Sequence, residues 1–224
     1  MGVGMRTEGT SGLAYWALGT EEPDSLLILI HAVGANERQL TGLARMQGPR
    51  TLCALPRGPL DVGPNMHAWF EVRFGPSGPS IRADQAEDSR LRLARFVEAL
   101  QAETGIVPAR TVVAGFSQGG IMSAGLALTR PDRVAGFGLL AGRLLPEIAP
   151  EVGARKALAG LHAFVAHGSA DTKLPVLWAE RADAWLAELG VPTESRRYAA
   201  DHELTEAMAA DFTAWVARLL DGWA

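Results

Sequence analysis

The chain lacks the features that mark secreted, membrane-spanning and nucleic-acid-binding proteins. Cys53 is the single cysteine of 224 residues, and its place in an apolar run is typical of a small core residue rather than a reactive thiol. No apolar signal segment begins the chain, and no apolar stretch is long enough to cross a bilayer. The net charge is −4 without a dense run of lysine and arginine, which argues against a nucleic-acid partner. We therefore expect a cytoplasmic protein.

Two common kinds of cofactor site are also missing from the sequence. No grouping of histidine, cysteine, aspartate and glutamate has the spacing of a metal site. No Gly-x-Gly-x-x-Gly follows the first long apolar run, so the phosphate-binding turn of a dinucleotide fold is absent. We expect neither a metal ion nor a cofactor.

The sequence does contain alternating strand and helix patterns. Its hydrophobic content of 48% is enough for one α/β domain with a buried core, and no linker or repeat divides residues 1–224. Residues 26–30 are continuously apolar, as in a central strand buried on both faces. Further strands are expected at 13–18, 50–55, 111–114, 134–141, from 161 onward and at 195–200, and helices at 83–103, 121–129, 176–189 and 205–220.

This alternation predicts a mainly parallel, twisted sheet with helices on both faces. The glycine and proline cluster at 75–79 is interpreted as an excursion at the edge of the domain, since neither side of it could form a complete sheet alone. The oligomeric state is not predicted, because Leu139, Leu140, Leu144 and Leu145 suit an interface as well as a core.

The most informative motif is Gly-x-Ser-x-Gly at 115–119. It follows the apolar run at 111–114 and precedes a helix-like segment, and that context makes Ser117 a candidate nucleophile on a sharp strand-to-helix turn. Small residues two places on either side allow neighbouring backbone to approach closely. In a chain with 25 glycines the motif by itself is equally consistent with a glycine-rich turn.

Two later segments supply the partners that a serine nucleophile needs, in the order Ser, Asp, His. Asp171 follows an apolar strand, and His202 lies between the last expected strand and the last helix, so both fall on loops at the carboxyl edge of the sheet. Asp201 adjoins His202, but neighbours in sequence rarely face each other well enough to pair. Glu203 is typical of a helix start.

These motifs resemble the carboxylesterase/phospholipase family of serine hydrolases, which includes the acyl-protein thioesterases. The resemblance covers most of the chain and is carried by IHAVG at 30–34, PRGP at 56–59, AWFE at 68–71, GFSQGG at 115–120, HGSAD at 167–171 with LP at 174–175, and DHE at 201–203. It implies an α/β-hydrolase fold, a Ser117, Asp171 and His202 triad, no cofactor, and hydrolysis of small-molecule carboxylic esters or thioesters through an acyl-enzyme.

The expected oxyanion hole consists of two backbone N–H groups. One is that of Gln118, directly after the nucleophile. The other, by the resemblance, is that of Val33. The family's usual His-Gly-x-Gly is His-Ala-Val-Gly at 31–34 here, and the Cβ of Ala32 restricts the backbone. Glu71 replaces a usual aspartate, with a small expected effect.

The remaining expectations concern histidines, substrate contacts and alternative functions. His31 and His167 are expected to be structural histidines whose rings bond to backbone, and His67 to be exposed. Trp69 and Leu174 are the candidate substrate contacts, although Trp69 suits the core equally well. The site is expected to be open and shallow, suited to short or accessible acyl groups. Two alternatives stay open: an acyltransferase with the same triad, and a non-catalytic small-molecule-binding module on a hydrolase scaffold.

Overall fold

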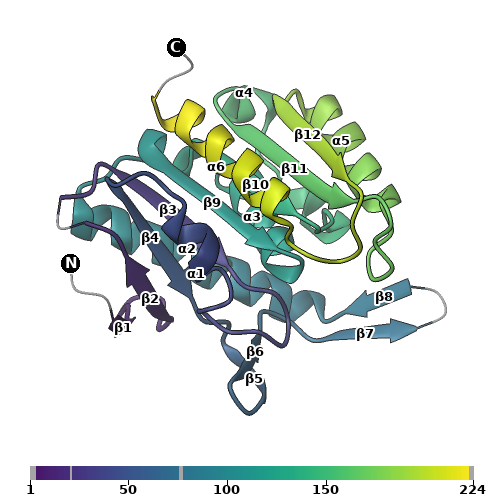
Figure 1. The fold of residues 1–224 in the computed structure, drawn as a ribbon, viewed down its shortest axis with the longest axis horizontal. Helices are drawn as coiled ribbons and strands as arrows, with labels where there is room; N and C mark the ends of the chain where they lie inside the picture. The colour runs from purple at the N-terminus through teal and green to yellow at the C-terminus, as the bar shows by residue number, and fades with distance from the viewer. Residues whose placement is uncertain (1–3, 21, 76–77, 222–224) are drawn as a thin grey trace.

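An eight-stranded sheet organises the computed structural model, which describes residues 4–20, 22–75 and 78–221 (Figure 1). The strand order is β1-β2-β4-β3-β9-β10-β11-β12; β1 and β2 pair antiparallel, and every pair from β4 to β12 is parallel. The strands are β1 (Gly4–Thr7), β2 (Ala14–Leu18), β3 (Ser25–Ile30), β4 (Thr51–Pro56), β9 (Thr111–Phe116), β10 (Gly136–Leu140), β11 (His162–Gly168) and β12 (Thr193–Tyr198).

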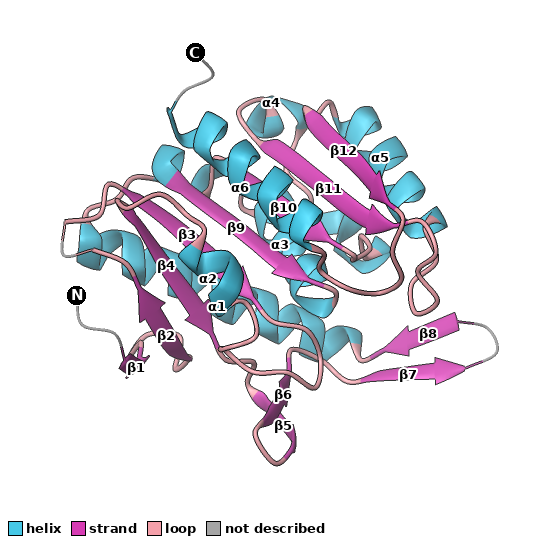
Figure 2. Ribbon diagram, in the orientation of Figure 1, coloured by secondary structure: helices cyan, strands magenta, loops and turns pink. Residues whose placement is uncertain are grey.

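Helices cover both faces of this sheet. On one face lie α2 (Ala83–Thr104), α3 (Gln118–Thr129), α4 (Arg155–Leu158) and α5 (Leu177–Leu189); on the other lie α1 (Thr41–Arg45) and α6 (Glu206–Asp221), which crosses in front of the strands in Figures 1 and 2. The two-residue period of a strand explains the division, because alternate side chains point to opposite faces. Thus Leu26 and Ile28 of β3 join the α2–α3 core, whereas Leu27 and Leu29 join the α6 core.

The helix after the predicted nucleophile is buried almost all round. In α3, 11 of the 12 residues from Gln118 to Thr129 are buried, and only the last is not. This burial matches its sequence of small and aliphatic residues without a charged side chain. Its amino-terminal end is therefore fixed by packing on every side.

Two hairpins stand away from the sheet between β4 and α2, as Figure 2 shows. They are β5 (Leu60–Gly63) with β6 (Met66–Ala68), and β7 (Val72–Gly75) with β8 (Gly78–Ile81). The second corresponds to the excursion expected at 75–79, of which residues 76–77 lie outside the described residues. The sequence reasoning missed both hairpins, β1, α1, α4 and the 3₁₀ turns at Pro108–Arg110, Pro131–Arg133 and Pro146–Glu151, because short segments carry little periodicity.

The mainly parallel α/β architecture is confirmed, with shifts at the ends of elements. β12 spans Thr193–Tyr198 rather than the expected 195–200. The strand ends at Tyr198 because a turn follows, in which the N–H of Ala200 donates to Tyr198 O. α3 begins three residues earlier than 121, since Ser117 alone makes the strand-to-helix turn. The four leucines at 139, 140, 144 and 145 are buried in the core, as is Cys53. Among the described residues, none of the helices has the length and apolar character needed to cross a membrane.

Candidate active site

Ser117 occupies a strained turn at the carboxyl end of β9. Its φ of 54° and ψ of −115° lie outside the regions that residues with a Cβ ordinarily adopt. The turn is held because the N–H of Ser117 donates to Leu140 O at 2.8 Å and because α3 begins at the next residue. The hydroxyl is thereby raised above the sheet edge, in the conformation of a nucleophile elbow.

Glycines at 115 and 119 make this turn possible. A Cβ on Gly115 would lie 2.6 Å from Ile30 O, and one on Gly119 would overlap that same oxygen. The first turn of α3 therefore packs directly on the end of β3, with no room for a side chain. Both glycines of the Gly-x-Ser-x-Gly motif are explained by this close backbone approach.

Hydrogen bonds join the three predicted triad residues in one line. His202 Nε2 lies 2.9 Å from Ser117 Oγ, and His202 Nδ1 lies 2.7 Å from Asp171 Oδ2. Because the carboxylate of Asp171 is an acceptor, His202 Nδ1 carries the proton and donates it to this hydrogen bond. In this tautomer Nε2 is unprotonated and can accept from the serine hydroxyl. The ring of Phe116 packs against the imidazole with centroids 5.1 Å apart. The arrangement has the geometry needed for base-assisted attack by the serine.

Asp171 is held by the loop that follows β11. Its Oδ1 accepts the backbone N–H groups of Lys173 at 2.9 Å and Leu174 at 2.7 Å. Asp201, the other candidate acid, instead accepts from the backbone and hydroxyl of Thr172. Its position beside His202 in sequence thus serves to join the loops rather than to orient the imidazole.

His167 supports Asp171 from beneath. It is 0% exposed, its Nε2 donates to Leu174 O at 2.7 Å, and the same nitrogen lies 3.2 Å from Asp171 Oδ2. Burial lowers the pKa of His167, which keeps the ring neutral, and its Nδ1 has no hydrogen-bond partner among the described residues. His167 therefore has the structural role expected from sequence.

His31 has a comparable role at the end of β3. Its Nε2 accepts the N–H of Gly58 at 2.8 Å, so Nδ1 carries the proton and donates to Ala32 O at 2.7 Å. Burial lowers the pKa of His31 to about 4. The neutral ring joins the end of β3 to the loop after β4. His67, which was expected to be exposed, is half-buried, and its backbone N–H donates to Ala35 O.

The loop after β3 accommodates the alanine that departs from the family pattern. Positive φ angles occur in this loop at Gly34, with a φ of 75°, and not at Ala32, whose N–H donates to Gln39 Oε1 at 2.8 Å. The Cβ at position 32 therefore causes no backbone strain. Among the described residues, the N–H of Val33 donates to no backbone or side-chain acceptor.

Gln118 contributes both its backbone and its side chain. As the first residue of α3, its N–H belongs to the group of helix-start donors that have no partner within the helix. Its side-chain Oε1 accepts from the N–H of Trp69 at 2.8 Å, and Nε2 donates to Phe70 O at 2.8 Å. The side chain thus ties the elbow to the neighbouring segment at 69–70.

A small depression of about 40 Å³ opens over Ser117 and His202. Leu174 lines it, but Trp69 does not, which corrects the expectation for that residue. Trp69 is 0% exposed, and its indole N–H donates to His31 O, so the ring belongs to the core; Phe70 forms the wall of the depression instead. The lining residues are Val33, Phe70, Val72, Ile81, Ser117, Gln118, Ile121, Arg143, Lys173, Leu174 and His202.

Two larger hollows adjoin this depression. One of about 270 Å³ between α2, α3 and the turn at Pro146–Glu151 shares Ile121 with it, and one of about 320 Å³ beside α5 shares Arg143. Arg143, Ile81 and Ile121 were missed by the sequence reasoning; the available signal for Arg143 was its position just after a parallel strand.

Within the described part of the chain, no group of three or more histidine, cysteine, aspartate or glutamate side chains is placed to hold a metal ion.

Comparison with known proteins agrees with this architecture. The chain matches the phospholipase/carboxylesterase family over residues 17–219. It is 27% identical over 184 residues to lysophospholipase-like protein 1 of Mus musculus, covering 75% of this chain and 70% of that protein. It is 35% identical over 92 residues to acyl-protein thioesterase 1 of Gibberella zeae, covering 37% of this chain and 39% of that protein.

Solved structures show the same fold. A carboxylesterase from Mesorhizobium loti superposes with a TM-score of 0.81 at 22% identity, covering 95% of this chain and 98% of that one. Esterase PE8 superposes with a TM-score of 0.79 at 24% identity, covering 91% and 97%. Because the family match spans residues 17–219, the chain belongs to the phospholipase/carboxylesterase family and is a hydrolase of the esterase or thioesterase type.

Proposed function

We propose that the protein hydrolyses small-molecule carboxylic esters or thioesters through an acyl-enzyme on Ser117. The observation that supports this most directly is the hydrogen-bonded line from Ser117 Oγ to His202 and on to Asp171. The strained φ of 54° at Ser117 adds to it, because such strain persists where the surrounding structure enforces it and is concentrated at functional sites.

In the proposed reaction, Ser117 Oγ attacks the acyl carbonyl while His202 Nε2 takes the hydroxyl proton. Asp171 accepts from Nδ1–H and stabilises the imidazolium that forms. The tetrahedral intermediate collapses, the proton passes from Nε2 to the departing alcohol or thiol, and the acyl group stays on Ser117. Water then attacks the acyl-enzyme with His202 again as base, and the carboxylic acid leaves.

The negative charge of each tetrahedral intermediate would be held by the backbone N–H groups of Val33 and Gln118. Two observations support this assignment: the N–H of Val33 has no acceptor in the described part of the chain, and Gln118 stands at the start of α3. The side-chain bonds of Gln118 to Trp69 and Phe70 would keep the second donor in place.

The small, open depression suits short or accessible acyl groups, with Leu174 and Phe70 on its wall. The names of the relatives, a lysophospholipase-like protein and an acyl-protein thioesterase, apply to those proteins and leave the substrate of this chain open. The cytoplasmic location expected from sequence stays a prediction.

The test is hydrolysis of a short p-nitrophenyl ester, with a fluorophosphonate probe to label the nucleophile. Ser117→Ala should lose both signals, with turnover falling by roughly 10⁴-fold or more. Ser169→Ala is the matched control, because this exposed serine follows β11 and its hydroxyl, among the described residues, donates to Tyr198 O alone. Turnover that survives in Ser117→Ala would contradict the proposal. Tight binding of the ester without turnover would favour the non-catalytic alternative.

A further inference from the structure

Arg143 is a buried arginine at the edge of the Ser117 depression. It follows the end of β10, is 7% exposed, and lines both the depression and the hollow beside α5. No described residue forms an ion pair or a hydrogen bond with its guanidinium. Burial lowers the pKa of Arg143, and the charge of the exposed Glu147, which forms no ion pair with it, offsets only part of this effect. A guanidinium nevertheless stays charged in proteins.

The only other buried arginine among the described residues provides a contrast. Arg90 is 5% exposed and uses its donors on Glu87 at 2.6 and 2.8 Å and on the hydroxyl of Thr129 at 2.6 Å. Such pairing is the rule, because a buried charge without a partner is costly. Arg143 has no such partner among the described residues, and it lies at the edge of the depression over Ser117.

An aromatic ring positions the Arg143 side chain. Its guanidinium carbon lies 4.8 Å from the ring centroid of Trp178 on α5, within the range of a cation–π contact. This contact uses the face of the guanidinium and leaves its N–H groups, which lie in the guanidinium plane, available. Arg143 is therefore held in place with its donors uncommitted.

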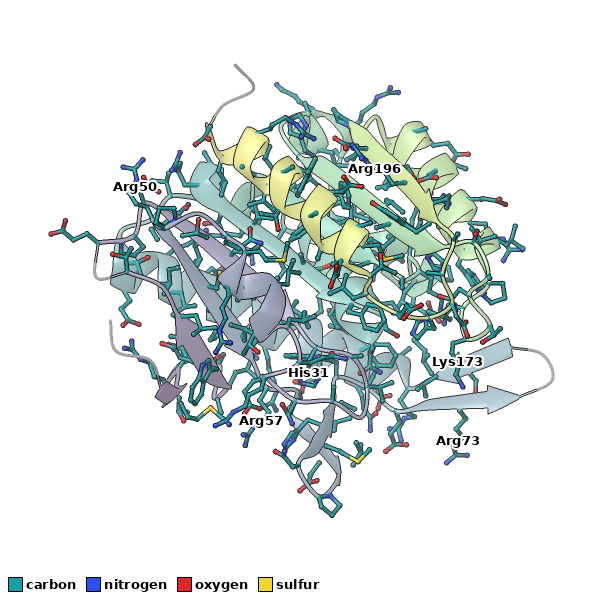
Figure 3. The ribbon with its side chains drawn as sticks, in the orientation of Figure 1. His31, Arg50, Arg57, Arg73, Lys173 and Arg196 are labelled. Atoms are coloured by element: carbon teal, nitrogen blue, oxygen red, sulfur yellow. The ribbon has the colours of Figure 1, made fainter. Side chains whose placement is uncertain are left out.

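The charge of the depression agrees with this. Its lining includes Arg143 and Lys173 and no acidic side chain, although the chain as a whole carries a net charge of −4. Lys173 is exposed and, within the described part of the chain, its ammonium pairs with no carboxylate. Figure 3 shows Lys173 in the loop after β11, beside the β7–β8 hairpin that supplies Val72 and Ile81 to the same depression.

We propose that Arg143, assisted by Lys173, binds an anionic oxygen group on the substrate, so that the preferred esters or thioesters carry a carboxylate or phosphate besides the scissile bond. This specificity rests on the proposed hydrolase function. A planar guanidinium binds both oxygens of such a group at once, and a low-dielectric surrounding strengthens that contact. The apolar wall of Phe70, Val72 and Ile81 would hold the carbon chain between the anion and the scissile carbonyl.

The test compares matched charged and neutral esters. In the acyl arm, mono-4-nitrophenyl adipate is compared with its neutral methyl ester; in the alcohol arm, the butyrate ester of 4-hydroxybenzoate is compared with that of methyl 4-hydroxybenzoate. We expect the native protein to favour the anionic ester in kcat/KM in one of the two arms, which identifies the end that carries the charge. In that arm Arg143→Gln should lower the anionic-to-neutral ratio by roughly 10- to 100-fold, mainly through KM.

Two further variants separate charge recognition from structure. Arg143→Lys should keep part of the ratio, because it retains the charge and loses the bidentate contact. Arg181→Gln should leave the ratio unchanged, because Arg181 is exposed on Trp178, 4.9 Å from its ring, and does not line the Ser117 depression. A native ratio near one in both arms, or equal losses on the charged and neutral esters in Arg143→Gln, would overturn the proposal.

Calorimetric titration with adipate and with 4-hydroxybenzoate distinguishes this proposal from the hydrolase function on which it rests. Turnover of the neutral esters without any Arg143-dependent ratio would leave the hydrolase intact and reject the anion site. Binding of either anion that is lost in Arg143→Gln, in a protein that turns over no ester, would support the site and reject the hydrolase.

Discussion

The site has two regions that differ in how their polar groups are bonded. At its floor, Ser117, His202 and Asp171 form hydrogen bonds with one another and with the backbone. At its rim, the cations of Arg143 and Lys173 have no carboxylate partner among the described residues. The floor stands on strand ends and a buried helix; the rim stands on loops and a hairpin. Hydrogen bonds within the protein fix the geometry of the floor residues before substrate binds. The unpaired cations of the rim can instead bind a group of the substrate, and so determine which substrate binds best. Substitutions at the floor should therefore lower the rate or the stability, and those at the rim should change selectivity.

The largest expected effect tests whether the floor acts as one hydrogen-bonded unit. Asp171→Asn should lower kcat by about 10⁴-fold, because an amide at that position favours the wrong tautomer of His202. Asp201→Asn, whose carboxylate bonds Thr172 instead, should lose less than about 10-fold. Steady-state kinetics on a p-nitrophenyl ester measures both, and the reverse order of effects would assign the acid to Asp201.

Close packing beneath the floor gives the next effect. Gly119→Ala should destabilise the fold by about 3 kcal/mol, because its Cβ would overlap Ile30 O. Gly125→Ala is the matched control in the same helix, where the nearest atoms lie 3.8 and 4.0 Å away, and it should stabilise by about 0.5–1 kcal/mol. Urea unfolding measures both changes, and equal stabilities would show that the backbone there can separate.

A pH titration of stability tests the buried histidines under the floor. The folded-state pKa of His31 is about 4, below the value near 6.5 of an unfolded histidine, so the unfolded chain binds more protons between these values. Stability should fall as pH drops from about 6.5 towards 4, by about 3 kcal/mol for this residue. The lowered pKa of His167 acts in the same direction.

The unfolding midpoint in urea at pH 7 and at pH 5 measures this dependence. His31→Gln should flatten it, because the amide does not titrate. A variant with the native slope would show that other groups cause the loss of stability in acid.

A rim substitution should be mild and selective by comparison. Ile81→Ala removes part of the half-buried wall of the depression, and kcat/KM for a four- to six-carbon acyl ester should fall about 5-fold through KM, from roughly 1 kcal/mol of lost apolar contact. Acetate esters, whose single methyl group offers little apolar area to contact, serve as the control. An equal loss on acetate would mean that the hairpin supports the floor.

The smallest effect is expected at the border between the two regions. Ala32→Gly restores the family's usual residue, and the rate should change by less than about 3-fold, because Ala32 has no positive φ and its N–H is bound by Gln39. A kcat that rises by more than about 10-fold would show instead that the alanine limits the oxyanion loop.

The contrast between floor and rim also explains what the sequence predicted. Residues 26–30 and 111–114 have strand patterns that predict their burial, and the Ser, Asp and His residues follow strand ends. The fold class and the meeting of those three groups therefore followed from local pattern and order. Trp69 and Phe70 lie in an irregular segment where periodicity does not assign faces. Whether Arg143 has a hydrogen-bond or ion-pair partner depends on residues from several distant segments. A local sequence pattern cannot predict that.

The separation of the floor residues along the chain has a consequence for how the protein folds. Ser117 and His202 meet across 85 residues, and His202 and Asp171 across 31, at the ends of parallel strands that cannot pair through a simple turn. Contacts of this kind form slowly, because long loops must close before they yield any stabilisation. During refolding the site cannot exist until β9, β11 and β12 have come together. Recovered enzyme activity is thus a signal of the completed molecule, and helical structure measured by circular dichroism should return before it.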